Sequence, residues 1–521
     1  MSRKVILTNA FRIIQKFISV ANIFFTFLPG FGKYNVGMLI TCCFLILAMF
    51  LDIFGFSVVL PAMACDMSLS TSQQGLLSAI PLIGLILSSY PWGLCADTKG
   101  RRKTLLVAMP VGLILSLAST MAPNFVSLAV LKFFSVSFST SANAAGFVLL
   151  AESVPSRQRS RLMFLMASAT MITQLTISSF ALPVFKLTFG YAIPWLGVVY
   201  TPWRLLLQII CLPSAIGILS IIFLKESPKF LLSRSRNEEA LEVFRSIFKS
   251  NTGFKKDNYT VTHVYLEEPP VDSSETSMLK KIWNQTAPLF KPPLLKNSVI
   301  LYYLLLTAYM TSTGYTMWVP TIANAYFSSG EDLHGHTFCD VASQSIRTRS
   351  NGTESADCTG TIDPKALYAT MVYSGAAAIC LILLSFIVGL GKKTLTLLVF
   401  TISSLCGVLL LFIRIPMLSI ALFFVFLYVT LILGNVNTYL VELNPTHLRG
   451  MTTCLSVVVS RGSGFFSVQI IASLQKDYCT PMLAGYVALV ISGLVVAFLL
   501  PSDTKSKEEK NQIEIKEKVD S

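Results

Sequence analysis

Three ionisable side chains lie inside long apolar stretches of this chain, where an uncompensated charge is costly. Asp52 and Lys132 each lie within a run of mostly hydrophobic residues, and Arg461 lies near the middle of another. On membrane-insertion scales such a group costs roughly 2.5–3.5 kcal/mol, so it needs a partner, water or a function. These three residues are therefore the first candidates for binding a solute or an ion.

Asp52 and Lys132 are expected at a similar depth in the membrane. Asp52 lies about nine residues before the end of the first apolar run, and Lys132 lies about seven residues after the start of the fourth. We predict that they form a charge pair at or beside a substrate site, with Asp52 as a candidate proton or cation acceptor. Arg461 could attract an anionic substrate or close a network with an acid. A structural ion pair that only packs helices together is the competing interpretation.

Polar side chains in other apolar runs are weaker candidates for the same site. An amide in lipid needs hydrogen-bond partners, so Asn143, Asn435 and Asn437 are expected to face a cavity. Tyr309 shares a helical face with Tyr302 and Trp318 and could line that cavity. Ordinary packing, or a position in the aromatic belt at the membrane surface, remains an equal possibility for each aromatic residue.

These residues need membrane-spanning helices to position them, and the composition of the chain predicts such helices. Of the 521 residues 53% are hydrophobic and only 13% are charged, against about 25% in a soluble domain. A span needs about 20 apolar residues, because the hydrocarbon core is about 30 Å thick and a helix rises about 1.5 Å per residue. We therefore predict an all-α membrane protein with twelve spans, at residues 36–61, 73–94, 104–122, 125–150, 162–186, 203–224, 297–321, 367–390, 394–413, 416–440, 450–474 and 480–500.

The distribution of lysine and arginine predicts the orientation of these spans. With the N-terminus inside, 32 of the 41 basic residues fall in cytoplasmic segments and 5 fall in outer loops. Both termini are thus expected in the cytoplasm. We predict five units along the chain. They are a cytoplasmic segment (1–35), a six-helix bundle (36–224), a basic cytoplasmic linker with a short helix (225–296), a second six-helix bundle with an outer loop at 322–366 (297–500), and a cytoplasmic tail (501–521).

The outer loop carries two cysteines and a glycosylation sequence. Cys339 and Cys358 share this loop, so we predict a disulfide between them, although Cys65 and Cys479 also lie on the outer side. Asn351 begins an Asn-Gly-Thr acceptor and is a candidate glycosylation site.

Two motifs recur in the two sets of six spans. The fourth span is followed by Glu152 and Arg159 around a proline, and the tenth span is followed by Glu442 and Arg449 at the same spacing. The turn after the second span, from Gly93 to Lys103, has a shorter copy without its acid after the eighth span. The sequence therefore predicts a parallel repeat of six spans.

The first of these turns resembles the signature of the major facilitator superfamily. It reads Gly93, three residues, Asp97, two residues, then Gly100-Arg101-Arg102. The Glu-Pro-Arg segments and Glu226-Ser-Pro-Lys resemble the sugar-porter and organic-ion branch, and the sequences before the first span and the cysteine-bearing loop are similar to the synaptic vesicle glycoprotein two group in its insect-like form. The resemblance covers nearly the whole chain and implies the twelve-helix fold of that superfamily, in which the first and fourth spans line one half of a central cavity.

The resemblance also implies a role for the signature turn. Asp97 beside Arg101 and Arg102 would form a latch with the Glu-Pro-Arg segments, one that closes the cytoplasmic side in one state and breaks in the other. Gly93 and Gly100 would allow close approach and chain reversal. A static turn rich in positive charge is the competing interpretation. The double glutamine of sugar porters is missing from the seventh span, which speaks against a hexose substrate.

The expected function is transport of a small charged organic solute by alternating access, with coupling to a proton or another cation left open. The alternative is a transporter-like vesicle membrane glycoprotein that acts as a regulator or scaffold through its loops, with trafficking partners on its cytoplasmic segments. No nucleotide loop, metal spacing or nucleophile arrangement is apparent, so we expect neither an enzyme nor a cofactor or metal. The basic residues lie between spans and form no single patch, which argues against nucleic acid. A vesicle or plasma membrane is the expected location.

Overall fold

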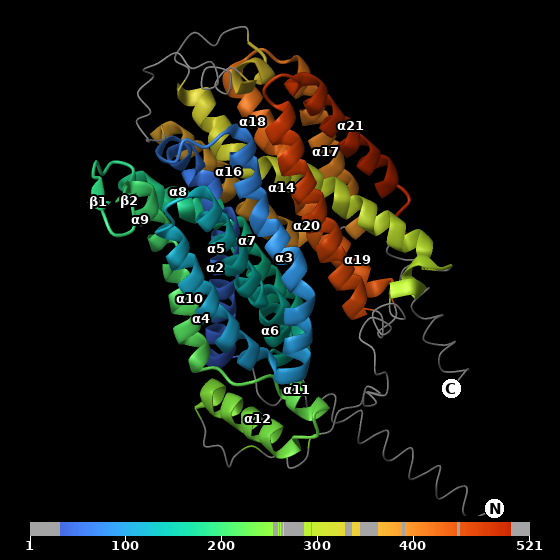
Figure 1. Ribbon diagram of the computed structural model, residues 1–521. Helices are drawn as coiled ribbons and strands as arrows, with labels where there is room; N and C mark the ends of the chain where they lie inside the picture. Colours follow the sequence, from blue (N-terminus) through green and yellow to red (C-terminus); the bar gives the residue numbers. More distant parts are fainter. Residues whose placement is uncertain are drawn as a thin grey trace, which may run out of the picture.

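Helices that run between two opposite ends of one bundle make up nearly all of the computed structural model (Figure 1). It describes residues 32–253, 259, 261, 264, 286–292, 294–328, 336–343, 363–387, 391–444 and 449–501. Ten helical stretches are long and apolar enough to cross a membrane, and the bent pair α7–α8 makes an eleventh. Helix α14 is more polar but has 34 residues, and it completes the predicted twelve.

The first six crossings form one half of the bundle, and several of them are broken. Thr173 begins α8 after a 44° bend that divides the fifth crossing, and a π-helical turn, η1, interrupts the fourth. The elements of this half are α2 (Lys33–Asp66), α3 (Thr71–Lys99), α4 (Arg101–Thr120), α5 (Phe125–Ser139), η1 (Ala142–Gly146), α6 (Phe147–Ser153), α7 (Ser156–Met171), α8 (Thr173–Val184), α9 (Pro202–Ile209) and α10 (Leu212–Ile222). Between α8 and α9 lies a hairpin of β1 (Tyr191–Ile193) and β2 (Val198–Tyr200), which the sequence did not predict.

The second six crossings repeat this arrangement after the linker. Their elements are α14 (Leu295–Ser328), α16 (Pro364–Ile387), α17 (Lys392–Phe412), α18 (Pro416–Leu427), η5 (Tyr428–Ile432), α19 (Leu433–Glu442), α20 (Arg449–Leu474) and α21 (Cys479–Ala497). A short 3-10 turn, η3 (Ala287–Phe290), precedes α14.

The predicted linker helix is present and is packed against the first half. Helix α12 (Asn237–Thr252) buries an apolar face that includes Leu241, Phe244 and Ile247 against α11 (Pro228–Ser233). The side chain of Asn251 accepts a hydrogen bond from the backbone N–H of Tyr34 at the start of α2. We call the end of the bundle beside these helices the α12 end (Figure 1).

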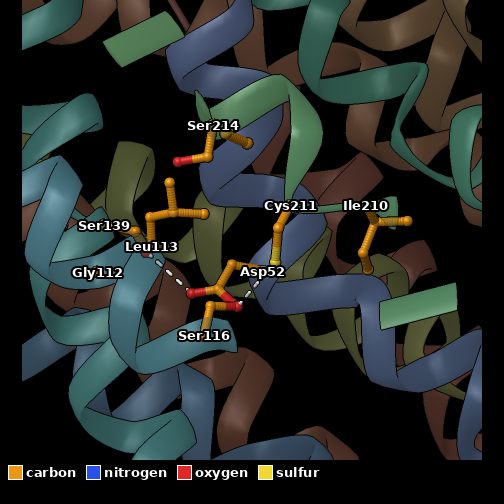
Figure 2. A pocket seen from close by; sticks show the side chains of 9 residues that line it. Asp52, Gly112, Leu113, Ser116, Ser139, Ile210, Cys211 and Ser214 are labelled. Carbon is orange, nitrogen blue, oxygen red and sulfur yellow. Dashed lines mark hydrogen bonds between the residues drawn. The ribbon is translucent and has the colours of Figure 1, made fainter. Parts of the chain in front are cut away.

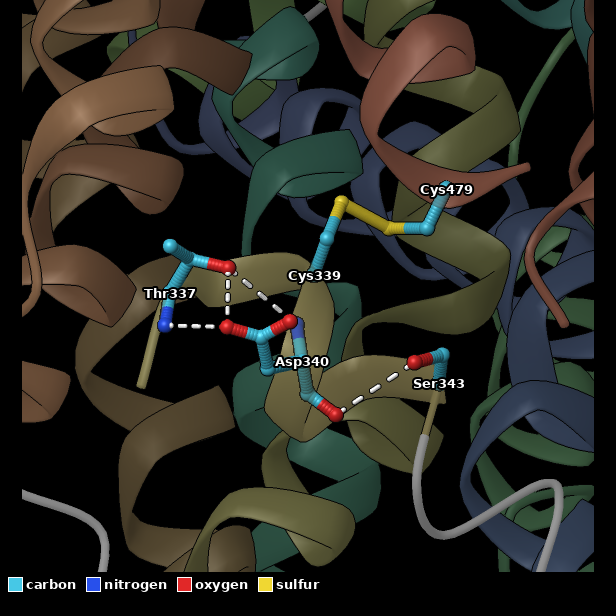
Figure 3. The surroundings of a disulfide bond; sticks show 5 residues. All are labelled: Thr337, Cys339, Asp340, Ser343 and Cys479. Atoms are coloured by element: carbon cyan, nitrogen blue, oxygen red, sulfur yellow. Dashed lines mark hydrogen bonds between the residues drawn. A yellow bond between two sulfur atoms is a disulfide. The ribbon is translucent and has the colours of Figure 1, made fainter. Parts of the chain in front are cut away.

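The opposite end carries a disulfide that differs from the predicted one. Cys339, in a helical segment at 338–343, is bonded to Cys479 at the start of α21, so we call this the disulfide end (Figure 3). The prediction of a Cys339–Cys358 bridge was therefore wrong. Short separation in the sequence suggested it, but the fold brings Cys479 close across 140 residues because α21 starts beside the loop. Cys358 and Asn351 lie outside the described residues.

Contacts between the two halves gather toward the disulfide end. There α3 runs beside α20, and a Cβ added to Gly75 would lie 2.5 Å from the Cβ of Ala472. The hydroxyls of Ser178 in α8 and Thr370 in α16 share a hydrogen bond of 2.6 Å. The halves are therefore closed against each other at this end.

Candidate functional site

Asp52 and Lys132 are paired, as the sequence predicted, and both are buried in the first half. The Nζ of Lys132 lies 2.5 Å from Oδ1 of Asp52, and the two side chains are 2% and 8% exposed. The hydroxyls of Ser116 and Ser135 donate to the same carboxylate at 2.8 and 2.6 Å (Figure 2 shows Asp52 beside Ser116). Helices α4 and α5 thus supply three donors to one carboxylate on α2, which compensates its charge in the apolar interior.

A small cavity adjoins this carboxylate between α2, α4 and α10. Its lining includes Asp52, Ser116, Cys211 and Ser214, and its volume is about 20 Å³ (Figure 2). A cavity needs about 10–15 Å³ to hold one water molecule. It is therefore large enough for a water beside Asp52 and too small for an organic solute.

Arg461 has a different environment, at the seam between the halves. Its guanidinium lies over the ring of Phe50 at 5.4 Å and over the ring of Tyr309 at 5.2 Å. Phe50 belongs to α2 and Tyr309 to α14, and all three residues lie near the middle of their helices. Arg461 is only 7% exposed, and no ion pair or hydrogen bond joins it to any residue in the described part of the chain. A guanidinium held by two rings but by no acid keeps its five donors available for an anion.

The remaining polar candidates do not all join this seam. Asn435 is buried and donates to the backbone oxygen of Lys392 and to the hydroxyl of Thr396, so it links α19 to α17 within the second half. Asn437 is exposed, and Asn143 is half-buried in the π-helical turn. Of the polar candidates, the structure brings only Tyr309 to Arg461.

The signature turn at the α12 end forms an ionic cluster within the first half. Arg101 pairs with Asp97 at 3.0 Å and with Glu152 at 3.2 Å, and its guanidinium lies 5.1 Å from the ring centre of Phe230. The hydroxyl of Ser227 donates to Oε2 of Glu152, the oxygen that the Nε of Arg101 also approaches. We call Asp97, Arg101, Glu152 and Ser227 the latch cluster. The side chains of Arg159, Glu442 and Arg449 lie outside the described residues, and a Cβ added to Gly93 would meet nothing within 4 Å.

Glu226 belongs to this turn, although sequence reasoning gave it no role. Its carboxylate accepts hydrogen bonds from the backbone N–H groups of Arg102 and Lys103 and so caps the first turn of α4. Gly100 makes this cap possible, because its φ is +107° and an added Cβ would lie 2.5 Å from Oε2 of Glu226. The signal in the sequence was an acid followed by Ser-Pro directly after the sixth span.

The second half repeats the backbone of this turn without its acid. Gly391 has a φ of +106°, like Gly100, and also precedes a helix. Two residues later, Lys393 donates to the backbone oxygens of Phe498 and Leu500 at the end of α21. Arg102, two residues after Gly100, donates to Ile221 and Ile222 at the end of α10. In each half the cation at this position ties the third crossing to the sixth.

The described residues include no group of three His, Cys, Asp or Glu side chains that could hold a metal ion. The candidate site consists of a buried ion pair with an adjacent small cavity, and an arginine at the seam between the halves.

Comparison with known proteins agrees with this architecture. A svop-1 protein of Caenorhabditis elegans is 25% identical over 487 residues, which cover 92% of this chain and 84% of that protein. Synaptic vesicle glycoprotein 2B of Rattus norvegicus is 22% identical over 340 residues, which cover 59% of this chain and 49% of that protein. Organic cation/carnitine transporter 7 of Arabidopsis thaliana is 25% identical over 226 residues, which cover 43% of this chain and 42% of that protein.

Solved structures show the same fold at low sequence identity. The partially occluded inward-open form of the xylose transporter XylE from E. coli matches with a TM-score of 0.63 and 14% identity, covering 90% of this chain and 99% of that one. The inward-open form of the same transporter matches with a TM-score of 0.62. The model of the Major Facilitator Superfamily matches residues 42–468. With this match over most of its length and the twelve crossings in two related halves, the chain belongs to the major facilitator superfamily.

Proposed function

We propose that the chain is a secondary transporter that moves a small organic anion across the membrane by alternating access, with Arg461 as the residue that binds the anion. The observation that carries this proposal is the position of the Arg461 guanidinium, between a ring from each half and without an acidic partner in the described part of the chain. An anion bound there would contact both halves, and contact with both halves lets a solute influence how they move relative to each other.

The chemistry of the surrounding side chains favours an organic anion over an inorganic one. Phe50 and Tyr309 flank the guanidinium with aromatic faces. Such faces bind apolar carbon well, while arginine binds a carboxylate with two parallel hydrogen bonds. A carboxylate joined to an apolar or aromatic body satisfies both requirements.

Asp52 is the proposed coupling residue. Its carboxylate is held by Lys132 and two serine hydroxyls, beside a cavity that can hold water. Protonation of Asp52 would release Lys132 from its ion pair, so uptake of a proton would change the charge balance among α2, α4 and α5. The competing role, a structural pair that only holds these helices together, predicts no effect of a pH gradient.

The latch cluster and the charge distribution suggest how the transporter is oriented. The basic linker and the latch cluster lie at the α12 end, which we assign to the cytoplasm. The Cys339–Cys479 disulfide lies at the other end, and disulfides persist on the oxidising side of a membrane. A vesicle or plasma membrane is the proposed location.

Uptake into proteoliposomes tests the proposal. Aromatic carboxylates, organic cations and neutral solutes of similar size would be offered with and without an inward proton gradient. A charge-assisted hydrogen bond contributes about 1.5–3 kcal/mol, so R461Q should weaken anion binding by roughly 10-fold to 150-fold. R461K should retain part of it. R414Q is the matched control, because Arg414 is an exposed arginine in the turn between α17 and α18. Anion uptake by R461Q at the wild-type level would refute the proposal.

A second candidate function follows from the similarity to synaptic vesicle glycoprotein 2B. The chain could act as a membrane glycoprotein that regulates or binds other proteins through its loops. Absence of uptake for every solute class, together with retained folding of the reconstituted protein, would favour this second function.

A further inference from the structure

The connection between α8 and α9 carries a single charged residue, Lys186, at its start. From Leu187 to Trp203 the chain has seventeen residues without Lys, Arg, His, Asp or Glu, and five of them are aromatic. A segment of this length is shorter than the roughly 20 residues that a helix needs to cross a bilayer, and the structure folds its middle into the β1–β2 hairpin. We call residues 187–200 the aromatic hairpin.

Several large apolar side chains of the aromatic hairpin are exposed, although Val198 is buried. Trp195 at the tip is 82% exposed, Tyr191 is 68% exposed, and Leu187 and Val199 are 47% and 46% exposed. At the base Phe189 stacks between Tyr191 and Tyr200, which stiffens the two strands. In Figure 1 the hairpin extends sideways from the first half, beside α9, and does not cover the bundle. Its exposed surface is therefore unaccounted for by packing within the described chain.

The position of the hairpin identifies the medium that surrounds it. It joins the ends of two membrane crossings, so it lies at the level where the hydrocarbon core gives way to the lipid headgroups. Phe180 on α8 and Leu212 and Ile216 on α10 are also exposed, which makes the hairpin continuous with surfaces that must face lipid. Tryptophan and tyrosine concentrate at this level because one end of each ring is apolar and the other can form a hydrogen bond.

We propose that the aromatic hairpin is a membrane anchor that lies in the headgroup region of the leaflet at the disulfide end, with Trp195 inserted among the lipids. The hairpin itself carries no charge, so neutral, zwitterionic lipids suffice for it, in contrast to basic segments that need anionic lipids. The exposed lysine beside it, Lys186, is a single charge rather than the cluster that such basic segments contain. The one nearby arginine, Arg204, is 2% exposed and donates to the backbone oxygens of Thr120 and Ala122, so it is not available to lipid phosphates.

Tryptophan fluorescence of the full chain in phosphatidylcholine nanodiscs tests this proposal. The emission of Trp195 is obtained as the difference between wild type and W195F. Lipids brominated near the glycerol should quench this difference severalfold more strongly than they quench the emission that remains in W195F. Aqueous iodide should quench it weakly. The result should not change when anionic lipid is added.

The matched control is W203F. Trp203 lies at the start of α9, just after the connection, but it is 2% exposed and donates to Asp66, so its difference spectrum should respond to neither quencher. Two results would overturn the proposal. Quenching of Trp195 by iodide but not by brominated lipid would place the hairpin in water, as a surface for a soluble partner. Quenching by neither would show that protein covers it, whether a second copy or another chain.

Discussion

Replacement of Gly75 by alanine should open the disulfide end of the transporter. An added Cβ would lie 2.5 Å from the Cβ of Ala472, whereas an ordinary contact is 3.4–4 Å. Helices α3 and α20 would have to separate by about 1 Å to accept it. Overpacking of this kind costs roughly 1–3 kcal/mol, and it acts only on the state in which this end is closed. The ratio of closed to open molecules should therefore fall by roughly 5-fold to 150-fold.

Distances between spin labels at Leu76 and Ser473 measure this change. Both side chains are exposed, and each is one residue from the contact. Double electron–electron resonance between spin-labelled unnatural amino acids at these two positions should show a new population with a longer label-to-label distance in Gly75→Ala. Unnatural amino acids avoid labelling of the native cysteines. The Gly485→Ala variant is the control, because an added Cβ there would meet nothing within 4 Å.

The second substitution Ala472→Gly provides a sharper test of the same reasoning. It removes the one atom within 3.4 Å of the new Cβ, since the next neighbours, in Gln469 and Trp318, lie at 3.7 and 3.9 Å. The double variant Gly75→Ala/Ala472→Gly should therefore recover the wild-type distance distribution. A distribution that is unchanged in the single variant, or unrecovered in the double variant, would refute the claim that this contact closes the disulfide end.

Three further predictions follow from the other contacts. Asp52→Asn and Lys132→Met should each lower the thermal stability of the protein, by about 3–5 kcal/mol in the free energy of unfolding, because each leaves one buried polar partner uncompensated. The double variant should recover most of this loss in a thermal melt; additive losses would contradict the pairing. Gly100→Ala should displace Glu226 from the first turn of α4 and raise hydrogen exchange there, whereas Gly253→Ala, also at positive φ but with open space around it, should leave exchange in α4 unchanged. Hydrogen bonds from the hydroxyl and backbone N–H of Thr337 hold the pKa of Asp340 below its ordinary value. The stability that Asp340 contributes should thus be complete above about pH 4 and decline as the pH falls through the lower folded-state pKa, and Asp340→Asn should abolish this dependence in hydrogen exchange of residues 338–343.

The sequence predicted the crossings and the repeat well because both depend on local properties. Apolar length determines which segments cross a bilayer. The number of residues from Asp52 and from Lys132 to the outer ends of their segments predicted that the two side chains lie at the same depth, where they are paired. The breaks at Ile172 and within the fourth crossing were not predicted, because packing against neighbouring helices decides where a long apolar segment bends.

Contacts between distant segments were the part that the sequence did not determine. On the predicted topology Cys339 had three possible partners, Cys65, Cys358 and Cys479, and nothing local distinguishes Cys479 from the other two. Glu226 caps a helix 124 residues away, and Asn435, an equally good cavity candidate by its polarity, turned out to bind α17. In each case the three-dimensional position of the partner, rather than the residue type, decides the role.

The pair of ties formed by Arg102 and Lys393 bears on how each half is held together. Each follows a glycine at positive φ by two residues, and each binds the end of the last crossing of its own half. Each half is thus held by a contact that lies entirely within it, because its third and sixth crossings are joined without a residue of the other half. Asp97 belongs only to the first copy of the turn, since Val388 occupies the corresponding position in the second. The two copies of the turn therefore share the tie between helices and differ in the ion pair.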